Sequence, residues 1–392
     1  MTLPGHPGSL CAASGSGPLY VVCGDRPGTS LHAVGLDGSI RWSRRFERAG
    51  GMLRVAEDGG IWLSGGGAFI ETLPTGSPGR RVVPSCLPDE RLGSFVVLPD
   101  GFLLTWTTSP YRGARVERLD RRGARVWSTP ITVRGLGYHG VTHRGVDTGW
   151  RPEPMPAWEP RDFTPERDEG LLVSGDRLLA TYVEIASGLG VGYCLDLGSG
   201  DLVGETPPHP TGARAVAGPG RFLVGAQGYG AFETYLYDRD GTVVAEWAGH
   251  GRPLVSHRGR IRIVELENRS SSPARLRRLH RDGTMTDGPM LPGYHTIGPV
   301  LGGDGRAAFW RDGRLQVTGP DLSVRTLYED HAQGGTDRML LLDDGLLVFV
   351  LTGDRATGKR TVVFAQTDLV PLDTGPWPCG EGNLQGNPVL PG

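Results

Sequence analysis

The sequence has few cysteines and no long apolar run, and both absences exclude classes of protein. Five cysteines among 392 residues, with no Cys-x-x-Cys spacing, offer no disulfide framework or zinc ribbon. The longest apolar stretch, LLLDDGLLVFVL, is interrupted by Asp343, Asp344 and Gly345, so it falls short of the ~18 apolar residues of a membrane span. The first residues, MTLPGHPGSLCAASG, lack the basic start and apolar core of a secretory leader. We therefore expect a cytoplasmic protein with no membrane partner.

Neither sign of charge dominates the chain. Lys and Arg number 41 against 43 Asp and Glu, which gives a formal net charge of −2. Nucleic-acid binding relies on a basic surface that neutralises phosphates, so nucleic acid is not an expected partner. Helical periodicity of 3.6 residues is also missing over any useful length, which excludes a mainly helical fold.

Turn residues between short alternating strands are abundant. The chain contains 63 Gly and 31 Pro. Four stretches each show an alternating strand, a turn with Gly and a second strand, and three of them end in Trp: LHAVGLDGSIRW (31–42), VERLDRRGARVW (116–127), TYLYDRDGTVVAEW (234–247) and LRRLHRDGTMTDG (276–288). Alternation with period two predicts half-buried strands, and Asp-Gly supplies the positive φ of a tight hairpin.

A second kind of hairpin precedes these stretches. In PVLGGDGRAAFW (299–310) and MLLLDDGLLVFV (339–350) the first strand is continuously apolar or small, as expected for a strand packed on both faces. Four strands in each ~40 residues, repeated, are typical of a β-propeller. We predict an all-β fold, an eight-bladed β-propeller of four-stranded antiparallel blades over residues 1–375. The units begin near residues 5, 47, 87, 131, 209, 250, 290 and 331, with seven blades possible if the weak second unit is an excursion.

A family resemblance rests on these units. The strand, Asp-Gly, strand and Trp pattern resembles the repeat of pyrroloquinoline-quinone-like (PQQ-like) β-propellers, and the tail PWPCGEGNLQGNP (376–388) is similar to a segment at the ends of such proteins. The resemblance implies the propeller fold. A vicinal Cys-Cys pair and a haem-attachment Cys-x-x-Cys-His are both missing, so we expect a member that does not carry the quinone.

Six of the ten histidines share one place in the repeat, a few residues ahead of the first strand of a unit. They are His6, His139, His209, His250, His295 and His331. In a propeller the chain crosses there to the mouth of the central channel, so we expect these imidazoles to gather around it. Imidazole nitrogen suits Zn, Fe or Cu, and zinc takes about four ligands. The predicted metal set is His209, His250, His295 and His331 with His139 as neighbour; a polar ligand pocket without metal is the alternative.

Other candidate site residues lie beside these histidines. Tyr138 and Tyr294 precede two of them in matching Gly-Tyr-His triplets and could donate a proton or hold substrate, or simply pack the loop. The insertion at 139–169 is too long for an ordinary connection and is predicted to form a lid, with Trp150 and Trp158 against substrate and His143 reaching the channel. Residues 376–392 form a Gly/Pro-rich tail.

These features predict a metal-dependent enzyme, a lyase, hydrolase or oxygenase, acting on a small molecule or a peptide. Two alternatives stay open at this point. A propeller can serve as a scaffold for protein partners without any catalytic residue, or it can bind a quinone or a sugar. The six histidines favour the enzyme because six of ten in the same place of the repeat, each from a different unit, exceed what chance placement would give.

Overall fold

The computed structural model describes residues 1–25, 28–47, 50, 52–65, 67–108, 113–131, 163–165, 170–184, 189–207, 209–210, 212–228, 231–265, 274–293, 296–330, 334–353 and 360–390. No α-helix occurs among these residues, in agreement with the predicted all-β fold. Accordingly, this part of the chain contains no helix with the length and apolar character that crossing a membrane requires.

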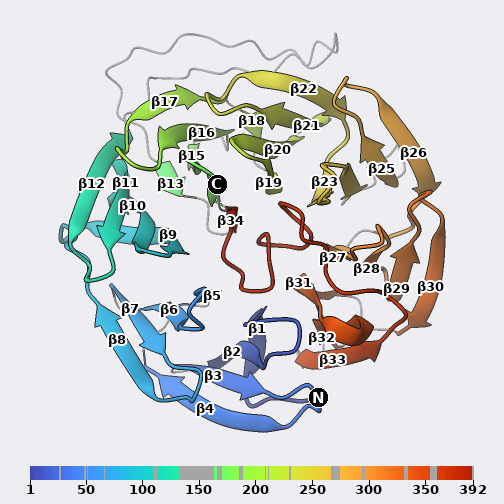
Figure 1. Ribbon diagram of the computed structural model, residues 1–392, viewed down its shortest axis with the longest axis horizontal. Coiled ribbons are helices and arrows are strands. Elements are labelled where there is room, and N and C mark those ends of the chain that lie inside the picture. The colour runs from blue at the N-terminus through green and yellow to red at the C-terminus, as the bar shows by residue number, and fades with distance from the viewer. Residues whose placement is uncertain are drawn as a thin grey trace. The chain divides into compact units, whose positions relative to one another are not determined.

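The strands pair with their sequence neighbours in antiparallel sheets (Figure 1). The first two sheets are β1 (His6–Ala12), β2 (Leu19–Asp25), β3 (Gly28–Val34) and β4 (Ile40–Phe46), then β5 (Leu53–Val55), β6 (Ile61–Gly65), β7 (Ala68–Thr72) and β8 (Pro78–Val82). The third and fourth are β9 (Glu90–Leu98), β10 (Gly101–Thr108), β11 (Ala114–Asp120) and β12 (Arg125–Ile131), then β14 (Leu171–Ser174), β15 (Arg177–Glu184), β16 (Leu189–Asp196) and β17 (Leu202–Glu205).

The second half of the chain continues the pattern. The fifth and sixth sheets are β19 (Arg214–Gly218), β20 (Arg221–Gly228), β21 (Ala231–Tyr237) and β22 (Val243–Ala248), then β23 (Gly251–Val255), β24 (Ile261–Glu265), β25 (Arg275–Leu279) and β26 (Met285–Met290). The last two are β27 (Thr296–Leu301), β28 (Ala307–Arg311), β29 (Arg314–Thr318) and β30 (Val324–Glu329), then β31 (Gly334–Leu341), the 3-10 turn η1 (Asp343–Gly345), β32 (Leu346–Thr352) and β33 (Arg360–Gln366). Three short strands extend the fourth sheet: β13 (Phe163–Pro165), β18 (His209–Pro210) and β34 (Val389–Leu390).

The predicted four-stranded units are confirmed. The second unit, which looked degenerate in the sequence, forms the complete sheet β5-β6-β7-β8. Among the described residues, the strand pairing between the seventh and eighth sheets is limited to one parallel pair, Gly298 with Arg338. Within the described residues the order of the units therefore matches eight blades rather than seven.

By its internal contacts the chain divides into two units. Unit 1 comprises Met1–Val83, Ala215–Ala217 and Gly251–Pro388, and unit 2 comprises Pro84–Arg214, Gly218–His250 and Val389–Gly392. Unit 1 thus contains the first, second, sixth, seventh and eighth sheets.

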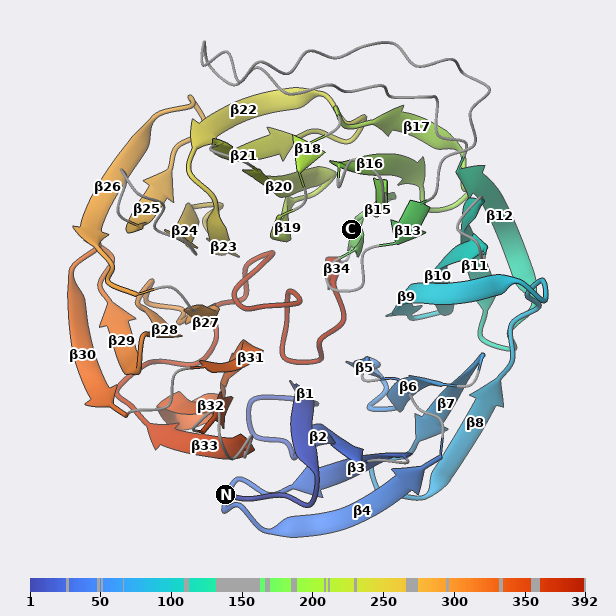
Figure 2. The same cartoon turned by 180° about the vertical axis from the view of Figure 1, so that it is seen from behind.

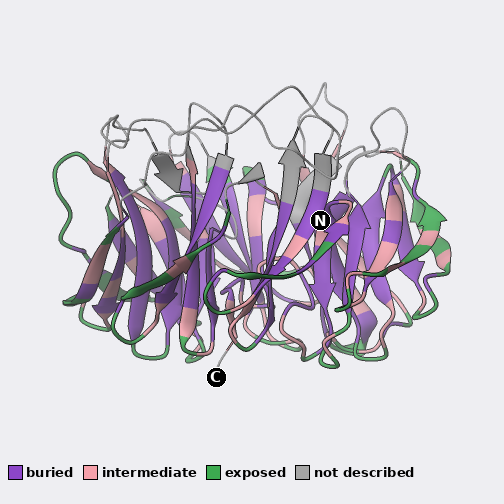
Figure 3. Cartoon of the chain, turned by 90° about the horizontal axis from the view of Figure 1, so that it is seen from above, coloured by how far each residue is buried: buried purple, intermediate pink, exposed green. Residues whose placement is uncertain are grey.

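Burial decreases from the first strand of a sheet to the last. Every residue of β27 is buried, whereas β30 of the same sheet is half-buried or exposed along its whole length. The exposed positions gather at the turns and on the last strands (Figure 3). The continuously apolar first strands of the sequence are therefore the strands packed on both faces, as predicted.

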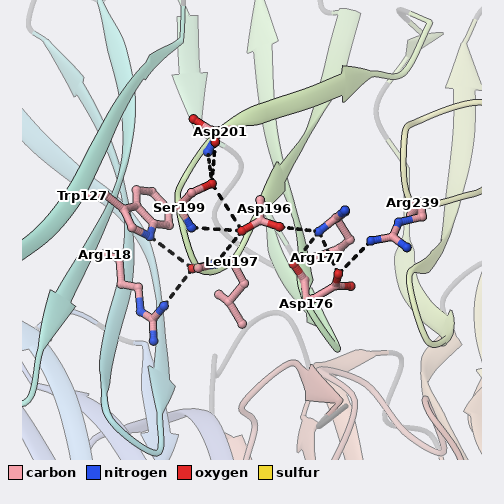
Figure 4. Close-up of polar contacts among 10 residues, drawn as sticks. Arg118, Trp127, Asp176, Arg177, Asp196, Leu197, Ser199, Asp201 and Arg239 are labelled. Atoms are coloured by element: carbon pink, nitrogen blue, oxygen red, sulfur yellow. Dashed lines mark hydrogen bonds and ion pairs between the residues drawn. The ribbon is translucent and has the colours of Figure 1, made fainter.

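The tryptophan that ends a repeat packs against the next sheet. Nε1 of Trp127, in β12, donates to the carbonyl oxygen of Leu197 at 3.1 Å, and Arg118 donates to the same oxygen at 2.9 Å (Figure 4). That oxygen belongs to the turn between β16 and β17, where Gly200 lies against the indole ring. Trp42 repeats the arrangement in unit 1, since its Nε1 donates to the carbonyl oxygen of Pro74 at 2.9 Å. The repeated Trp therefore joins consecutive sheets.

The turn that receives Trp127 carries a set of charged contacts as well. Arg177 pairs with Asp196 at 2.6 Å and with Asp176 at 3.0 Å, and Asp176 also pairs with Arg239 at 2.7 Å (Figure 4). The side chains of Asp176 and Arg239 are largely exposed. The solvent-exposed pair of Asp176 with Arg239 therefore contributes about 0–1 kcal/mol.

The two ends of the chain add strand-like contacts to unit 1. The backbone of Met1 exchanges two hydrogen bonds with Val362 in β33, at 2.8 and 3.0 Å. The C-terminal segment runs past the first strands β1, β5, β23 and β27 (Figures 1 and 2), where backbone donors bond to its carbonyl oxygens. These bonds join Ala12 to Leu384, Val55 to Gln385, Val255 to Trp377 and Leu301 to Pro378.

A buried cluster of ion pairs links this tail to β5 and β31. Oε1 of Glu381 lies 2.9 Å from Nη1 of Arg54 in β5, and its Oε2 lies 2.7 Å from Nη1 of Arg338 in β31. The side chains of Arg54 and Arg338 are 1% and 8% exposed. Burying two guanidinium groups is costly unless a carboxylate neutralises them, so Glu381 is the residue that allows both to be buried.

Candidate functional site

A small pocket of about 100 Å³ opens in unit 1 where two hairpin turns meet the C-terminal segment. One turn joins β23 to β24, the other joins β27 to β28, and residues 371–375 run beside both. Its polar lining consists of Ser256, His257, Arg258, Arg260, Arg262, Asp304 and Asp373. Three arginines against two carboxylates make the lining cationic.

Arg262 is the buried charge of this pocket. Its residue is 4% exposed, and Nη1 donates to the carbonyl oxygen of Gly305 at 2.7 Å. Within the described part of the chain, Arg262 forms no ion pair. Burial, followed by the charges of Arg278 and Arg260, lowers the pKa of Arg262 to about 10, so the guanidinium stays protonated at neutral pH. The charge of Asp321 offsets these effects only in small part, and a buried cation without an ion-pair partner is the environment in which an anion gains most.

A buried carboxylate orients the only histidine of the pocket. The Asp373 side chain is 1% exposed; its Oδ2 lies 2.7 Å from Nδ1 of His257, and its Oδ1 accepts from the backbone N–H of His257 at 2.7 Å. The backbone N–H of Gly375 donates to the same Oδ1 at 2.6 Å. Nε of Arg258 donates to Nε2 of His257 at 3.2 Å.

These contacts fix the tautomer of His257. Arginine can only donate, so Nε2 must accept, and a carboxylate accepts, so Nδ1 must carry the proton. In this arrangement the ring donates from Nδ1 and presents an acceptor lone pair at Nε2. The side chain of His257 is 39% exposed and lines the pocket.

Two other polar side chains of the pocket, those of Asp304 and Ser256, have partners within the protein. Asp304 pairs with Arg306 at 2.7 Å, and Oγ of Ser256 accepts from the backbone N–H of Arg260 at 3.1 Å. Gly375 lies so close to the β23–β24 turn that an added Cβ would come within 2.4 Å of the backbone nitrogen of His257. Glycine at this position lets the tail carry Asp373 up to the histidine.

The predicted metal ligands are only partly within the described residues. His6 is the first residue of β1 and is exposed, and the backbone of His209 lies in β18. His250 directly precedes β23 and is 3% exposed, with its ring against the backbone of Gly225. His6 belongs to unit 1, whereas His209 and His250 belong to unit 2. Among the residues that are described, no group of three or more His, Cys, Asp or Glu is arranged to hold a metal ion.

The remaining predicted site residues lie outside the described residues. They are Tyr138, His139, His143, Trp150, Trp158, Tyr294, His295 and His331. The metal site, the proton donors and the lid therefore stay predictions.

Sequence reasoning missed the residues that line the pocket. His257 is one of the four histidines that do not share the common place in the repeat, so it was not among the candidate ligands. One signal was present: the hairpin PLVSHRGRIRIV (253–264) replaces the usual Asp-Gly turn by Ser-His-Arg-Gly-Arg. The partner Asp373 is 116 residues away from His257, so no local pattern could connect them.

Comparison with known proteins supports the fold. No protein-family model matches the chain, and no curated protein matches it in sequence. The Dos1 propeller aligns with a TM-score of 0.58 at 8% identity, covering 92% of this chain and 93% of its own. The chain has a β-propeller fold.

Two enzymes are among the similar structures. The dihydro-heme d1 dehydrogenase NirN, in complex with DHE, aligns with a TM-score of 0.54 at 13% identity, covering 83% of this chain and 67% of its own. A streptogramin B lyase aligns with a TM-score of 0.47 at 14% identity, over 93% of this chain and 96% of its own. At 13% identity, the likeness to the NirN structure concerns the fold alone and does not extend to function.

Proposed function

We propose that this β-propeller is a binding protein whose pocket in unit 1 takes a small oxyanion. The observation that carries the proposal is Arg262, a buried guanidinium that lines the pocket and forms no ion pair within the described residues, with Asp321 adding only a smaller electrostatic attraction. An oxyanion of the ligand would supply the missing negative charge. Arg258 and Arg260, which are exposed at the same pocket, would attract the anion and complete its coordination.

The size of the pocket restricts the ligand. Sites for drug-sized ligands and cofactors occupy about 300–1,000 Å³, whereas this pocket measures about 100 Å³. A volume of that size holds several water molecules, and hence an oxyanion of a few heavy atoms. A quinone or a sugar chain, two of the ligands considered from the sequence, exceeds it.

Isothermal titration with sodium sulfate and sodium phosphate tests the proposal on the full chain. Removing a charged donor costs about 1.5–3 kcal/mol, so Arg262→Gln should weaken binding roughly 10- to 150-fold. The matched control is Arg314→Gln, which removes an equal charge from a half-exposed pair with Glu329. Unchanged affinity in Arg262→Gln, with the control also unchanged, would refute the proposal, and far-UV circular dichroism verifies that both variants fold.

A second candidate function rests on the register of the histidines. His6 is the first residue of β1 and His250 directly precedes β23, so both lie at the start of a first strand. We propose as this second candidate that the predicted histidine set binds Zn, Fe or Cu and supports a metal-dependent reaction. Elemental analysis of the untagged protein tests it, since a chain that carries no transition metal and takes none up on titration would remove it. A protein partner on the propeller remains a prediction.

A further inference from the structure

The pocket contains a second determinant besides positive charge, the acceptor lone pair on Nε2 of His257. Oδ2 of Asp373 lies 2.7 Å from Nδ1 and accepts a hydrogen bond from it, while Nε2 accepts from Arg258 and so offers no hydrogen to an incoming ligand. An oxygen atom that carries no hydrogen would meet this lone pair with a lone pair of its own. An oxygen that carries a hydroxyl hydrogen would instead donate to it.

The geometry points to a ligand that is both an anion and a hydrogen-bond donor: we propose that the site selects hydrogen phosphate over sulfate. This inference rests on the proposed function, because Arg262 must first provide the anion site. The two ions have the same tetrahedral shape and, at mildly alkaline pH, the same charge. They differ in one hydroxyl, so their discrimination isolates the role of His257.

The exposed Arg258 explains how Nε2 can be free for the ligand. In the structure its Nε donates to Nε2 at 3.2 Å, a long contact from a solvent-exposed side chain. A phosphate hydroxyl would replace this donor on Nε2, and the released guanidinium could then pair with another phosphate oxygen. The exchange keeps a hydrogen bond on Nε2 and adds an ion pair between Arg258 and the phosphate. Sulfate has no hydroxyl to donate, so Arg258 would remain bonded to Nε2.

Replacing Asp373 by asparagine provides the decisive perturbation. The retained Oδ1 can still accept from the backbone N–H groups of His257 and Gly375. The new amide NH₂ replaces Oδ2 opposite Nδ1 and can only donate to it, so the imidazole proton must move to Nε2. Nε2 then donates, and the advantage of the hydroxyl-bearing ion disappears.

The experiment is titration calorimetry of the full chain with inorganic phosphate and with sulfate at mildly alkaline pH. We expect wild type to bind phosphate at least about tenfold more tightly than sulfate, as the loss of one buried hydrogen bond implies. Asp373→Asn should bring the ratio to about one or reverse it. Long-range proton–nitrogen NMR correlation of the His257 ring should show the proton on Nδ1 in wild type and on Nε2 in the variant.

Asp304→Asn is the matched control, since it removes the same charge from the same pocket and keeps Oδ1 for the backbone N–H of Arg306. This variant should bind both ions more tightly by the same factor and leave the ratio of their affinities unchanged. Methyl phosphate distinguishes free phosphate from a phosphate ester as the ligand. Its dianion has no hydroxyl and should bind like sulfate, so tight binding of the ester overturns the assignment.

The outcomes separate the inference from the proposed function. If wild type binds neither ion, the oxyanion site itself is wrong. If it binds both with equal affinity and Arg262→Gln weakens both, the oxyanion site stands and the selectivity of His257 is refuted. An NMR spectrum with the proton on Nε2 in wild type would refute it as well.

Discussion

Replacing Glu381 by glutamine should destabilise the protein at neutral pH. The carboxylate lies 2.9 Å from Arg54 and 2.7 Å from Arg338, and its own side chain is 19% exposed. Glutamine has nearly the same shape but no charge, and its amide nitrogen would face one guanidinium as a second donor. The substitution therefore removes the charge of the attachment and leaves the backbone contacts of the tail in place.

The expected cost follows from the burial of the two arginines. Removing one member of a buried ion pair leaves the other charge uncompensated and costs about 3–5 kcal/mol. Here one carboxylate compensates two guanidinium groups, of which Arg54 is almost fully buried. We therefore expect a loss of about 3–5 kcal/mol of unfolding free energy, measured as a shift of the urea or thermal midpoint.

The pH dependence of this loss is a sharper test than its size. Burial would raise the pKa of Glu381, but the charges and hydrogen bonds of Arg54 and Arg338 outweigh it and lower the pKa below its ordinary value. A lowered pKa contributes stability that is complete above the unfolded-state pKa of about 4.3 and is lost as the pH falls through the folded-state pKa. The difference between wild type and Glu381→Gln should therefore shrink in acid.

The control is Glu329→Gln, which breaks a pair of 3.1 Å with Arg314 in which both side chains are exposed. It should change stability by less than about 1 kcal/mol. If Glu381→Gln were no more destabilising than this control at neutral pH, or if its cost were the same at all pH values, the buried ion pair would not be what attaches the tail.

Two further predictions concern the contact between consecutive sheets. Gly200→Ala should destabilise by more than Gly38→Ala, because both have φ near +80° but only at Gly200 would the new Cβ lie 2.5 Å from a ring atom of Trp127; equal melting temperatures would contradict the indole contact. Trp127→Phe should cost about 1 kcal/mol or more, for the lost N–H bond to Leu197 and reduced packing, although Arg118 still satisfies that carbonyl oxygen. Urea unfolding measures it, and an unchanged midpoint would contradict the role assigned to the ring.

Local patterns predicted the strands and their turns because each depends on neighbouring residues. Alternation marked the outer strands, continuous apolar runs marked the first strands, and Asp-Gly marked turns such as the one at Gly38, where φ is +81°. The repeated Trp was also visible, but its partner was not. The carbonyl oxygen of Leu197 lies 70 residues from Trp127, so only the packing of consecutive sheets reveals the contact.

The pocket was beyond sequence reasoning for a related reason. Its chemistry comes from Arg262 on β24 and His257 in the preceding turn, combined with Asp373 from the tail. A histidine in a hairpin turn is ordinarily a surface residue, and nothing near His257 in the sequence marks it as oriented by a buried carboxylate. The histidine pattern at the starts of the units remains a hypothesis about chemistry, since many of its members lie outside the described residues.

The hydrogen bonds between the C-terminal segment and the first strands β1 and β5 can form only late in synthesis. Ala12 and Val55 donate to residues that lie more than 300 positions later in the chain, so their backbone donors remain exposed on the nascent sheets until that segment has been synthesised. During that interval the young protein presents open strand edges, which are prone to aggregation, to every neighbour. Chains truncated before Leu384 would keep the backbone donors of Ala12 and Val55 without these acceptors. Proteases that act on incompletely folded chains would then find exposed strand edges in them.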